Sequence, residues 1–126
     1  KYRNTNQIVE LVSKTLHVHM KPNSYDGPSV THIAPRNVNA FFKDKKGLKT
    51  IICTEENKAK YMRKAYNDLA LKGKISRNKI NIMTVYESKG LEFTSVAVAP
   101  EGMSESERYI AYTRALKELA VIQSKE

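Results

Sequence analysis

The sequence predicts an α/β domain with a mainly parallel sheet covered by helices on both faces. Short apolar runs of strand length alternate along the chain with segments whose apolar residues recur every three or four positions. Helices that alternate with buried strands in this way imply a parallel sheet. At 126 residues and 14.3 kDa the chain is long enough for one domain with a core and too short for two. We therefore expect residues 1–126 to form a single domain.

The first half of the chain is predicted to contain a helix over residues 7–15, a strand over 29–34, a short helix over 35–42 and a strand over 48–53. Thr5 or Asn4 can cap the first helix, whose apolar residues have helical spacing. The strand at 29–34 alternates apolar and polar residues, Pro35 opens the short helix, and Gly47 closes it. The apolar run at 48–53 is typical of a buried parallel strand.

The second half is predicted to contain a helix from residue 55 to about 72, strands over 80–83 and 95–99, a helix over 105–116 and a last strand over 119–123. Glu55 and Glu56 lie in the first turn of their helix, where the helix dipole favours carboxylates. The segment between the two middle strands, residues 84–93, is predicted to be a loop. It should lie at the carboxyl end of a strand, where parallel sheets collect ligands.

The chain is strongly basic, with 22 Lys and Arg against 13 Asp and Glu and a formal net charge of +9. Such a balance favours a polyanionic partner, for example nucleic acid or a nucleotide. The alternative is a solvated basic surface without a partner.

A single cysteine excludes an internal disulfide, and Cys53 lies in an apolar run where a buried thiol is expected. No apolar run approaches the ~20 residues of a membrane span, and the first residues do not resemble a signal peptide. These features lead us to expect a soluble protein with no membrane partner, in the reducing cytoplasm. The chain begins at Lys1 without methionine, which suggests a fragment of a longer protein.

The loop at 84–93 carries several groups that could contact phosphate or sugar. Thr84 and Ser88 can donate hydroxyl hydrogen bonds to a phosphate backbone. Gly90 permits a tight turn with exposed amides, and Glu92 can accept from a sugar hydroxyl. A plain turn between strands, with Glu92 solvated, would have a similar composition.

Arg114 is placed by the predicted helix over 105–116 close to an apolar face. An arginine there is either a structural ion-pair partner of Glu107 or Glu118, or a phosphate ligand that offers a bidentate fork. Composition does not separate these alternatives.

Three motifs resemble a known family. TVYESKGLEF at residues 84–93 and ERYIAYTRA at 107–115 resemble motifs V and VI of superfamily 1 helicases of the UvrD/Rep type, and KYRNTNQI at 1–8 resembles motif IV. The motifs occur in the family's order and extend over nearly the whole chain. The resemblance implies the second, C-terminal RecA-like domain of such a motor. No GxxxxGK[ST] phosphate loop occurs in the sequence, and in the family that loop belongs to the first domain.

In the family, ATP lies between the two RecA-like domains, and the magnesium ligands belong to the first. The resemblance therefore implies ATP with Mg²⁺ as cofactor, no metal ligand in this chain, and an N-terminal RecA-like domain as partner. By motif, Tyr2 would stack on adenine, Glu92 would bind the ribose near Gly90, and Arg3 and Arg114 would be catalytic arginines at the γ-phosphate.

Motif V also implies DNA contacts, which we assign to Thr84, Tyr86 and Ser88. Tyr86 stands where many relatives have histidine, and a tyrosine could stack on a base instead. Asn4 replaces the usual serine of motif IV, and Ile110-Ala111-Tyr112 departs from the usual letters of motif VI.

The stretch between the strands ending near Cys53 and beginning near Ile80 has no room for the inserted subdomain of Rep-type enzymes. This resembles the branch that includes helicase IV and HelD. Our main hypothesis is that the chain is the C-terminal motor domain of an ATP-dependent DNA helicase or translocase. The alternatives are a HelD-like factor that remodels RNA polymerase without unwinding DNA, and a RecA-like domain kept only as a scaffold.

Overall fold

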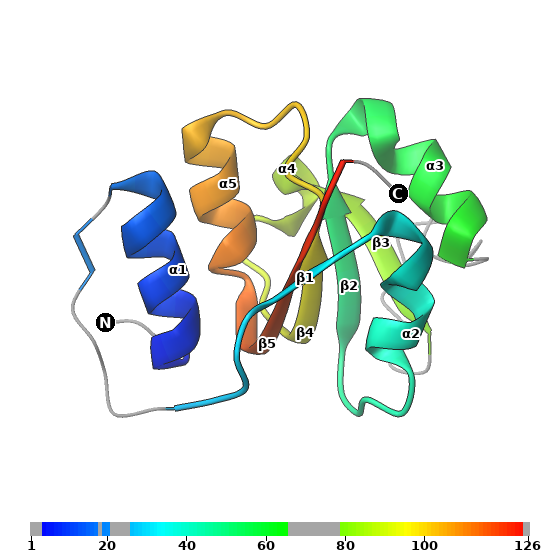
Figure 1. Cartoon of the computed structure of the whole chain (residues 1–126). Helices are drawn as coiled ribbons and strands as arrows, with labels where there is room; N and C mark the ends of the chain where they lie inside the picture. Colours follow the sequence, from blue (N-terminus) through cyan, green and yellow to red (C-terminus); the bar gives the residue numbers. More distant parts are fainter. Residues whose placement is uncertain (1–3, 18, 21–25, 66–78, 125–126) are drawn as a thin grey trace.

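The computed structural model describes residues 4–17, 19–20, 26–65 and 79–124. These residues form a sheet of parallel strands between two layers of helices (Figure 1). The strands are β1 (Thr31–Ile33), β2 (Lys49–Cys53), β3 (Ile80–Thr84), β4 (Phe93–Val98) and β5 (Ala115–Ile122), in the spatial order β1-β5-β4-β2-β3. The predicted fold class, α/β with a parallel sheet covered on both faces, is confirmed.

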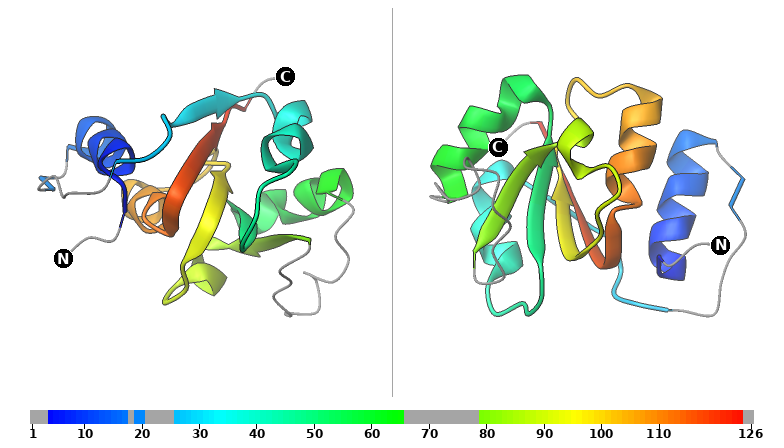
Figure 2. Two further views of the ribbon diagram at one scale, coloured as in Figure 1. Left: turned by 90° about the horizontal axis from the view of Figure 1, so that it is seen from below. Right: turned by 180° about the vertical axis from the view of Figure 1, so that it is seen from behind.

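The helices divide between the two faces of the sheet (Figure 2). Their bounds are α1 (Asn6–Leu16), the 3-10 helix η1 (Pro35–Asn37), α2 (Val38–Phe42), α3 (Glu55–Ala65), α4 (Val85–Ser88) and α5 (Glu105–Tyr112). One face carries α1, α4 and α5, and the other carries α2 and α3. Parallel strands need crossover connections, and here some of these pass over one face and some over the other.

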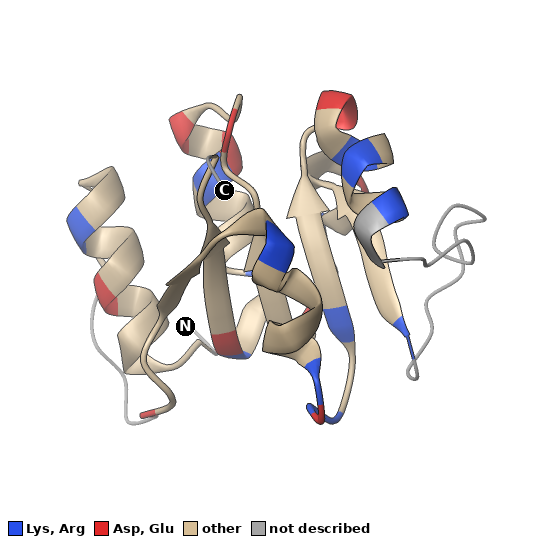
Figure 3. Ribbon diagram, turned by 45° about the vertical axis from the view of Figure 1, so that its right-hand side comes forward, with Lys and Arg blue, Asp and Glu red and all other residues tan. Residues whose placement is uncertain are grey.

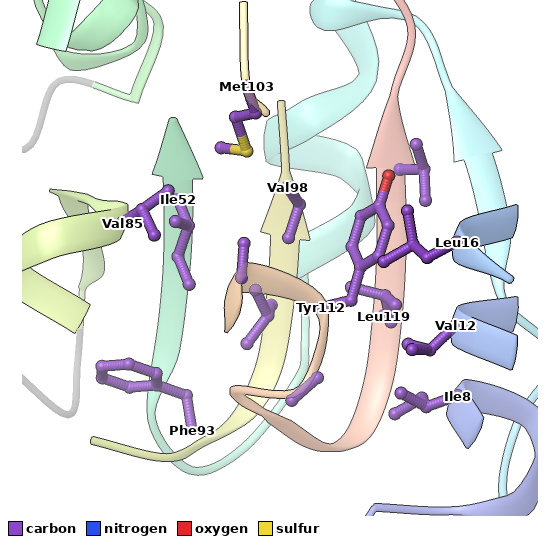
Figure 4. Packing of buried hydrophobic residues seen from close by; sticks show 14 of the residues in the cluster. Ile8, Val12, Leu16, Ile52, Val85, Phe93, Val98, Met103, Tyr112 and Leu119 are labelled. Carbon is purple, nitrogen blue, oxygen red and sulfur yellow. The ribbon is translucent and has the colours of Figure 1, made fainter. Parts of the chain in front are cut away.

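Alternating side chains of the central strands fill two cores. On β2, Ile52 joins the core under α1 and α5, whereas Ile51 and Cys53 join the core under α2 and α3. Figure 4 shows the first core, in which Ile8, Val12 and Leu16 of α1 point toward Tyr112 and Leu119. Burial of apolar side chains on this scale is the main stabilising contribution, at roughly 25 cal/mol per Å² removed from water.

Cys53 is fully buried, as predicted, and burial raises the pKa of its thiol to about 12. A thiol with such a pKa is almost wholly protonated at neutral pH and is a poor nucleophile. Within the described ranges, no helix is both long enough and apolar enough to cross a membrane. The same residues contain no group of three or more side chains suited to hold a metal ion.

Several predicted boundaries were wrong, among them the start of β4, which begins at Phe93 instead of Ser95. The predicted loop at 84–93 contains α4, because Thr84 and Glu87 form a capping box at its start. The helix predicted to end at residue 116 ends at Tyr112, and β5 begins at Ala115 instead of Leu119. The part of the α3 prediction beyond Ala65 lies outside the described residues.

Candidate functional site

Three segments that are far apart in the sequence meet where β4 and β5 begin. Phe93 pairs with Ala115 at the amino ends of these strands, and the Phe93 amide donates to the Arg114 carbonyl at 2.9 Å. The side chain of Asn4 reaches the same place from the start of α1. Residues of the motif IV, V and VI segments therefore share one end of the sheet.

Arg114 lies in the turn between α5 and β5, and its half-buried side chain is held by backbone carbonyls. Its Nε donates to the Ile110 carbonyl at 3.1 Å, and its Nη1 donates to the Leu91 carbonyl at 3.1 Å. Its Nη2 lies 3.4 Å from the Thr113 hydroxyl. A guanidinium has five N–H groups, so these bonds orient the fork and leave N–H groups for an anion.

Asn4 connects motif IV to motif VI. Its side chain is 5% exposed, and its amide nitrogen donates to the Thr113 carbonyl at 2.9 Å and to the Ala115 carbonyl at 2.6 Å. Asn4 thus fixes the backbone on both sides of Arg114. The two preceding residues, Tyr2 and Arg3, were predicted to contact adenine and the γ-phosphate, and both lie outside the described residues.

The structural ion-pair alternative for Arg114 is wrong. Glu118 pairs with Lys45 at 2.9 Å, and the carboxylate of Glu107 accepts from the Ser104 amide in the capping box of α5. Neither glutamate contacts the guanidinium, whose described partners are neutral oxygen atoms. An anion would therefore meet no competing carboxylate among these contacts.

Gly90 and Glu92 lie toward the same end of the sheet as Arg114, because the segment between β3 and β4 crosses the sheet. It starts at the carboxyl end of β3 and finishes at the amino end of β4 (Figure 2). The prediction that the whole segment lies at the carboxyl end was therefore wrong. Glu92 is half-buried and directly precedes Phe93. Gly90 has φ +81°, and an added Cβ would have no neighbour within 4 Å, so the predicted tight turn at this glycine is confirmed.

Thr84, Tyr86 and Ser88, the predicted DNA contacts, lie in the first half of this segment. Ser88 is fully buried and its hydroxyl donates to the Val85 carbonyl at 2.7 Å, so the structure contradicts its predicted phosphate contact. Thr84 is 7% exposed and its hydroxyl accepts from the Glu87 amide. Tyr86, in contrast, is 80% exposed, and the ammonium of Lys89 lies 5.6 Å from its ring centroid.

Glu87 fixes the start of α4 and joins it to α3. Its carboxylate accepts from the Thr84 amide at 2.9 Å and from the Lys58 ammonium at 2.9 Å. Burial would raise the pKa of this carboxyl, but the Thr84 amide and Lys58 outweigh burial and lower the pKa below its ordinary value. Tyr86, the preceding residue, thus lies on a turn of helix that is held in place by these contacts.

Comparison with known proteins identifies a structural neighbour. No protein-family model matches the chain, and no curated protein matches it. Among solved structures, the chain is similar to the C-terminal domain of a possible DNA helicase from Lactobacillus plantarum WCFS1. The TM-score is 0.65 at 20% sequence identity, with 97% of this chain and 86% of that chain covered. The similarity agrees with the mixed α/β, RecA-like fold predicted from the sequence.

Sequence reasoning missed Asn4 as a site residue, because its partners are carbonyls more than 100 positions away. It also missed Glu87, although the spacing of Thr84 and Glu87 is the signature of a capping box and was present in the sequence.

Proposed function

We propose that this chain is the C-terminal motor domain of an ATP-dependent DNA helicase or translocase of superfamily 1. The observation that supports the proposal is the arrangement around Arg114. Its guanidinium is held by the Leu91 carbonyl of the motif V segment, while Asn4 of the motif IV segment holds the backbone on either side of it. A structural neighbour described as a domain of a possible DNA helicase agrees with this assignment.

In the proposed motor, this domain forms one wall of an ATP site whose phosphate loop and Mg²⁺ ligands come from an N-terminal RecA-like domain. Arg114 would neutralise charge that develops on the transferred phosphoryl group, with Arg3 as a second cation. Glu92 would bind the ribose, Gly90 would allow close approach, and Tyr2 would stack on adenine. Arginines in this role accelerate phosphoryl transfer by roughly 10³ to 10⁵.

The nucleotide and the base contact of the nucleic acid would lie at different ends of the sheet. Arg114 lies at the amino ends of β4 and β5, whereas Tyr86 lies near the carboxyl end of β3. An exposed aromatic ring beside the Lys89 ammonium is suited to stack on a base while the cation attracts the backbone. Closure of the two domains on ATP would then move Tyr86 relative to the other domain.

The test uses the protein that joins this chain to an N-terminal RecA-like domain. Arg114→Lys keeps the charge but loses the fork, and we expect ATP turnover to fall by about 10³ with a much smaller change in nucleotide affinity. Arg63→Ala, at an exposed position on α3, is the matched control and should turn over ATP normally. Thermal unfolding of both variants verifies that they fold. Normal turnover by a folded Arg114→Lys variant would exclude the proposed role.

A motor that remodels RNA polymerase without unwinding DNA is a second candidate. The observation that favours it is the short connection between Cys53, the end of β2, and Ile80, the start of β3, which leaves no room for an inserted subdomain. Strand-displacement activity of the whole protein would support the helicase, whereas polymerase binding without strand displacement would support the second candidate.

A further inference from the structure

The two ends of the sheet carry opposite charge (Figure 3). Lysines gather where the strands begin, and carboxylates gather where they end. We define the basic edge as the five lysines at the amino end whose ammonium groups are not in a described ion pair. These are Lys43, Lys46, Lys49, Lys79 and Lys117.

Strand register brings these lysines together from segments far apart in the sequence. Lys49 begins β2 and pairs with Ile80, which directly follows Lys79. On its other side Lys49 pairs with Ser95 of β4, which in turn pairs with Glu118 of β5, next to Lys117. Lys43 and Lys46 lie in the loop that leads into β2. The basic edge therefore extends across β3, β2, β4 and β5.

The nearby carboxylates, Asp44, Glu92 and Glu118, are fewer than the five lysines of the basic edge. Glu118 is already paired with Lys45 at 2.9 Å, and that ammonium also lies 4.7 Å from the Phe41 ring centroid. Asp44 is the exposed carboxylate of the loop that carries Lys43 and Lys46. Four lysines of the basic edge are exposed and Lys49 is half-buried, so their charges reach solvent.

Carboxylates are concentrated at the opposite end of the sheet. Carboxylates lie in the first turns of α3, α4 and α5 and in the turn after β4, namely Glu55, Glu56, Glu87, Glu101, Glu105 and Glu107. Lys58 is engaged there with Glu87. The net charge of the chain is thus distributed unevenly, and a polyanion would be attracted to the amino end.

We propose that the basic edge binds the phosphate backbone of nucleic acid, at the end of the sheet that also carries Arg114 and away from Tyr86. Adjacent strands lie about 4.8 Å apart, so three strand spacings between β3 and β5 cover about 14 Å. One strand of a duplex carries a phosphate about every 3.4 Å along the axis, so this distance matches about four phosphates. The proposal goes beyond the motor function, because it depends on the arrangement of charge and not on ATP.

The experiment measures binding of the 126-residue chain to a fluorescent 20-nucleotide single strand and to a 20-base-pair duplex, by anisotropy at several salt concentrations. Lys43→Gln/Lys46→Gln removes two contacts, which should lower the slope of log K against log salt by about 1.8 for the duplex and about 1.4 for the single strand. Affinity at 0.1 M salt should then fall by roughly 10- to 100-fold. The nucleic acid that the parent chain binds more tightly at the same salt concentration is the preferred ligand.

The matched control is Lys14→Gln/Arg63→Gln, which removes the same net charge at exposed positions on α1 and α3. It should bind nearly as well as the parent chain, and circular dichroism verifies that both variants fold. Equal losses in the two double variants would overturn the proposal in favour of non-specific attraction by net charge. Loss of affinity in a Tyr86→Ala variant but not in Lys43→Gln/Lys46→Gln would overturn the proposal, because the phosphate backbone would then lie away from the basic edge. Unchanged binding by Lys43→Gln/Lys46→Gln would also overturn it and would favour an acidic protein as the partner of the basic edge.

Discussion

Asn4→Ala tests whether the side chain that joins motif IV to motif VI holds the candidate site together. The Asn4 amide donates to two backbone carbonyls, those of Thr113 and Ala115, at 2.9 and 2.6 Å, and its side chain is 5% exposed. Alanine removes both donors without changing either carbonyl. The two oxygens would then be buried without this partner.

The expected cost follows from the number of groups affected. A buried polar group left without a partner costs about 1–3 kcal/mol, so two carbonyls predict a loss of about 2–6 kcal/mol in the free energy of unfolding. With a typical slope of about 2 kcal/mol per M urea for a small domain, the midpoint should fall by about 1 to 3 M. Asn4→Asp should cost more, because a carboxylate would face two carbonyl oxygens.

The assay is urea unfolding followed by circular dichroism, with Asn6→Ala as the control. Asn6 makes an exposed hydrogen bond to Asp26 at 3.0 Å, so its truncation should cost less than about 1 kcal/mol. The reasoning would be refuted if Asn4→Ala cost no more than Asn6→Ala. It would also fail if Asn4→Asp were the more stable of the two Asn4 variants.

Two further predictions concern stability. Gly47→Ala and Gly90→Ala both place alanine at positive φ, +85° and +81°, at a cost of about 1–2 kcal/mol. At Gly47 the added Cβ would also overlap the Thr94 hydroxyl and lie 3.0 Å from its Cβ. Gly47→Ala should therefore be less stable than Gly90→Ala by a further 1–3 kcal/mol or so in urea unfolding, and equal losses would contradict this account. Glu87 has a folded-state pKa below its unfolded value of about 4.3, so its contribution is present above that pH and is lost as pH falls through the folded pKa. Glu87→Gln should thus be destabilised relative to the parent at pH 7, and the difference should shrink as pH falls below about 4.3 and through the folded pKa; a difference independent of pH would disprove the assignment.

The sequence predicted the order and type of most elements, because their apolar patterns are strong. Ile51, Ile52 and Cys53 form the continuous apolar run of a buried strand, and the structure buries all three. Helical spacing in α1 likewise predicted the side chains that it buries, among them Ile8 and Val12. The local apolar pattern was sufficient here, because helices cover both faces of the sheet and its strands are therefore buried on both sides.

The end of α5 could not be predicted in this way. Ala115 and Leu116 continue the composition of a helix, but Asn4 binds the carbonyls of Thr113 and Ala115, and the Phe93 amide binds that of Arg114. Long-range contacts thus convert the last predicted turn of helix into the start of a strand. Arg114 therefore lies in the turn between α5 and β5 and not within a helix.

The location of Glu92 failed for a topological reason. Sequence places it after β3, but β4 pairs with β2 and β5, and the chain must return to the amino end of the sheet before β4 can begin. Any connection between two parallel strands must return in this way, so the predicted parallel sheet already implied that Glu92 lies at the amino end. Thr84 and Glu92 therefore lie at opposite ends although eight positions separate them.

The segment from Val85 to Glu92, which connects β3 to β4, is held at its two ends by different contacts. At one end Glu87 binds the Thr84 amide and Lys58 of α3, whereas near the other end the Arg114 guanidinium donates to the Leu91 carbonyl. Rotation of that guanidinium toward a phosphate would release only the second of these contacts. In the proposed motor, binding and release of the nucleotide would then change how firmly the segment that carries Tyr86 is held at Leu91.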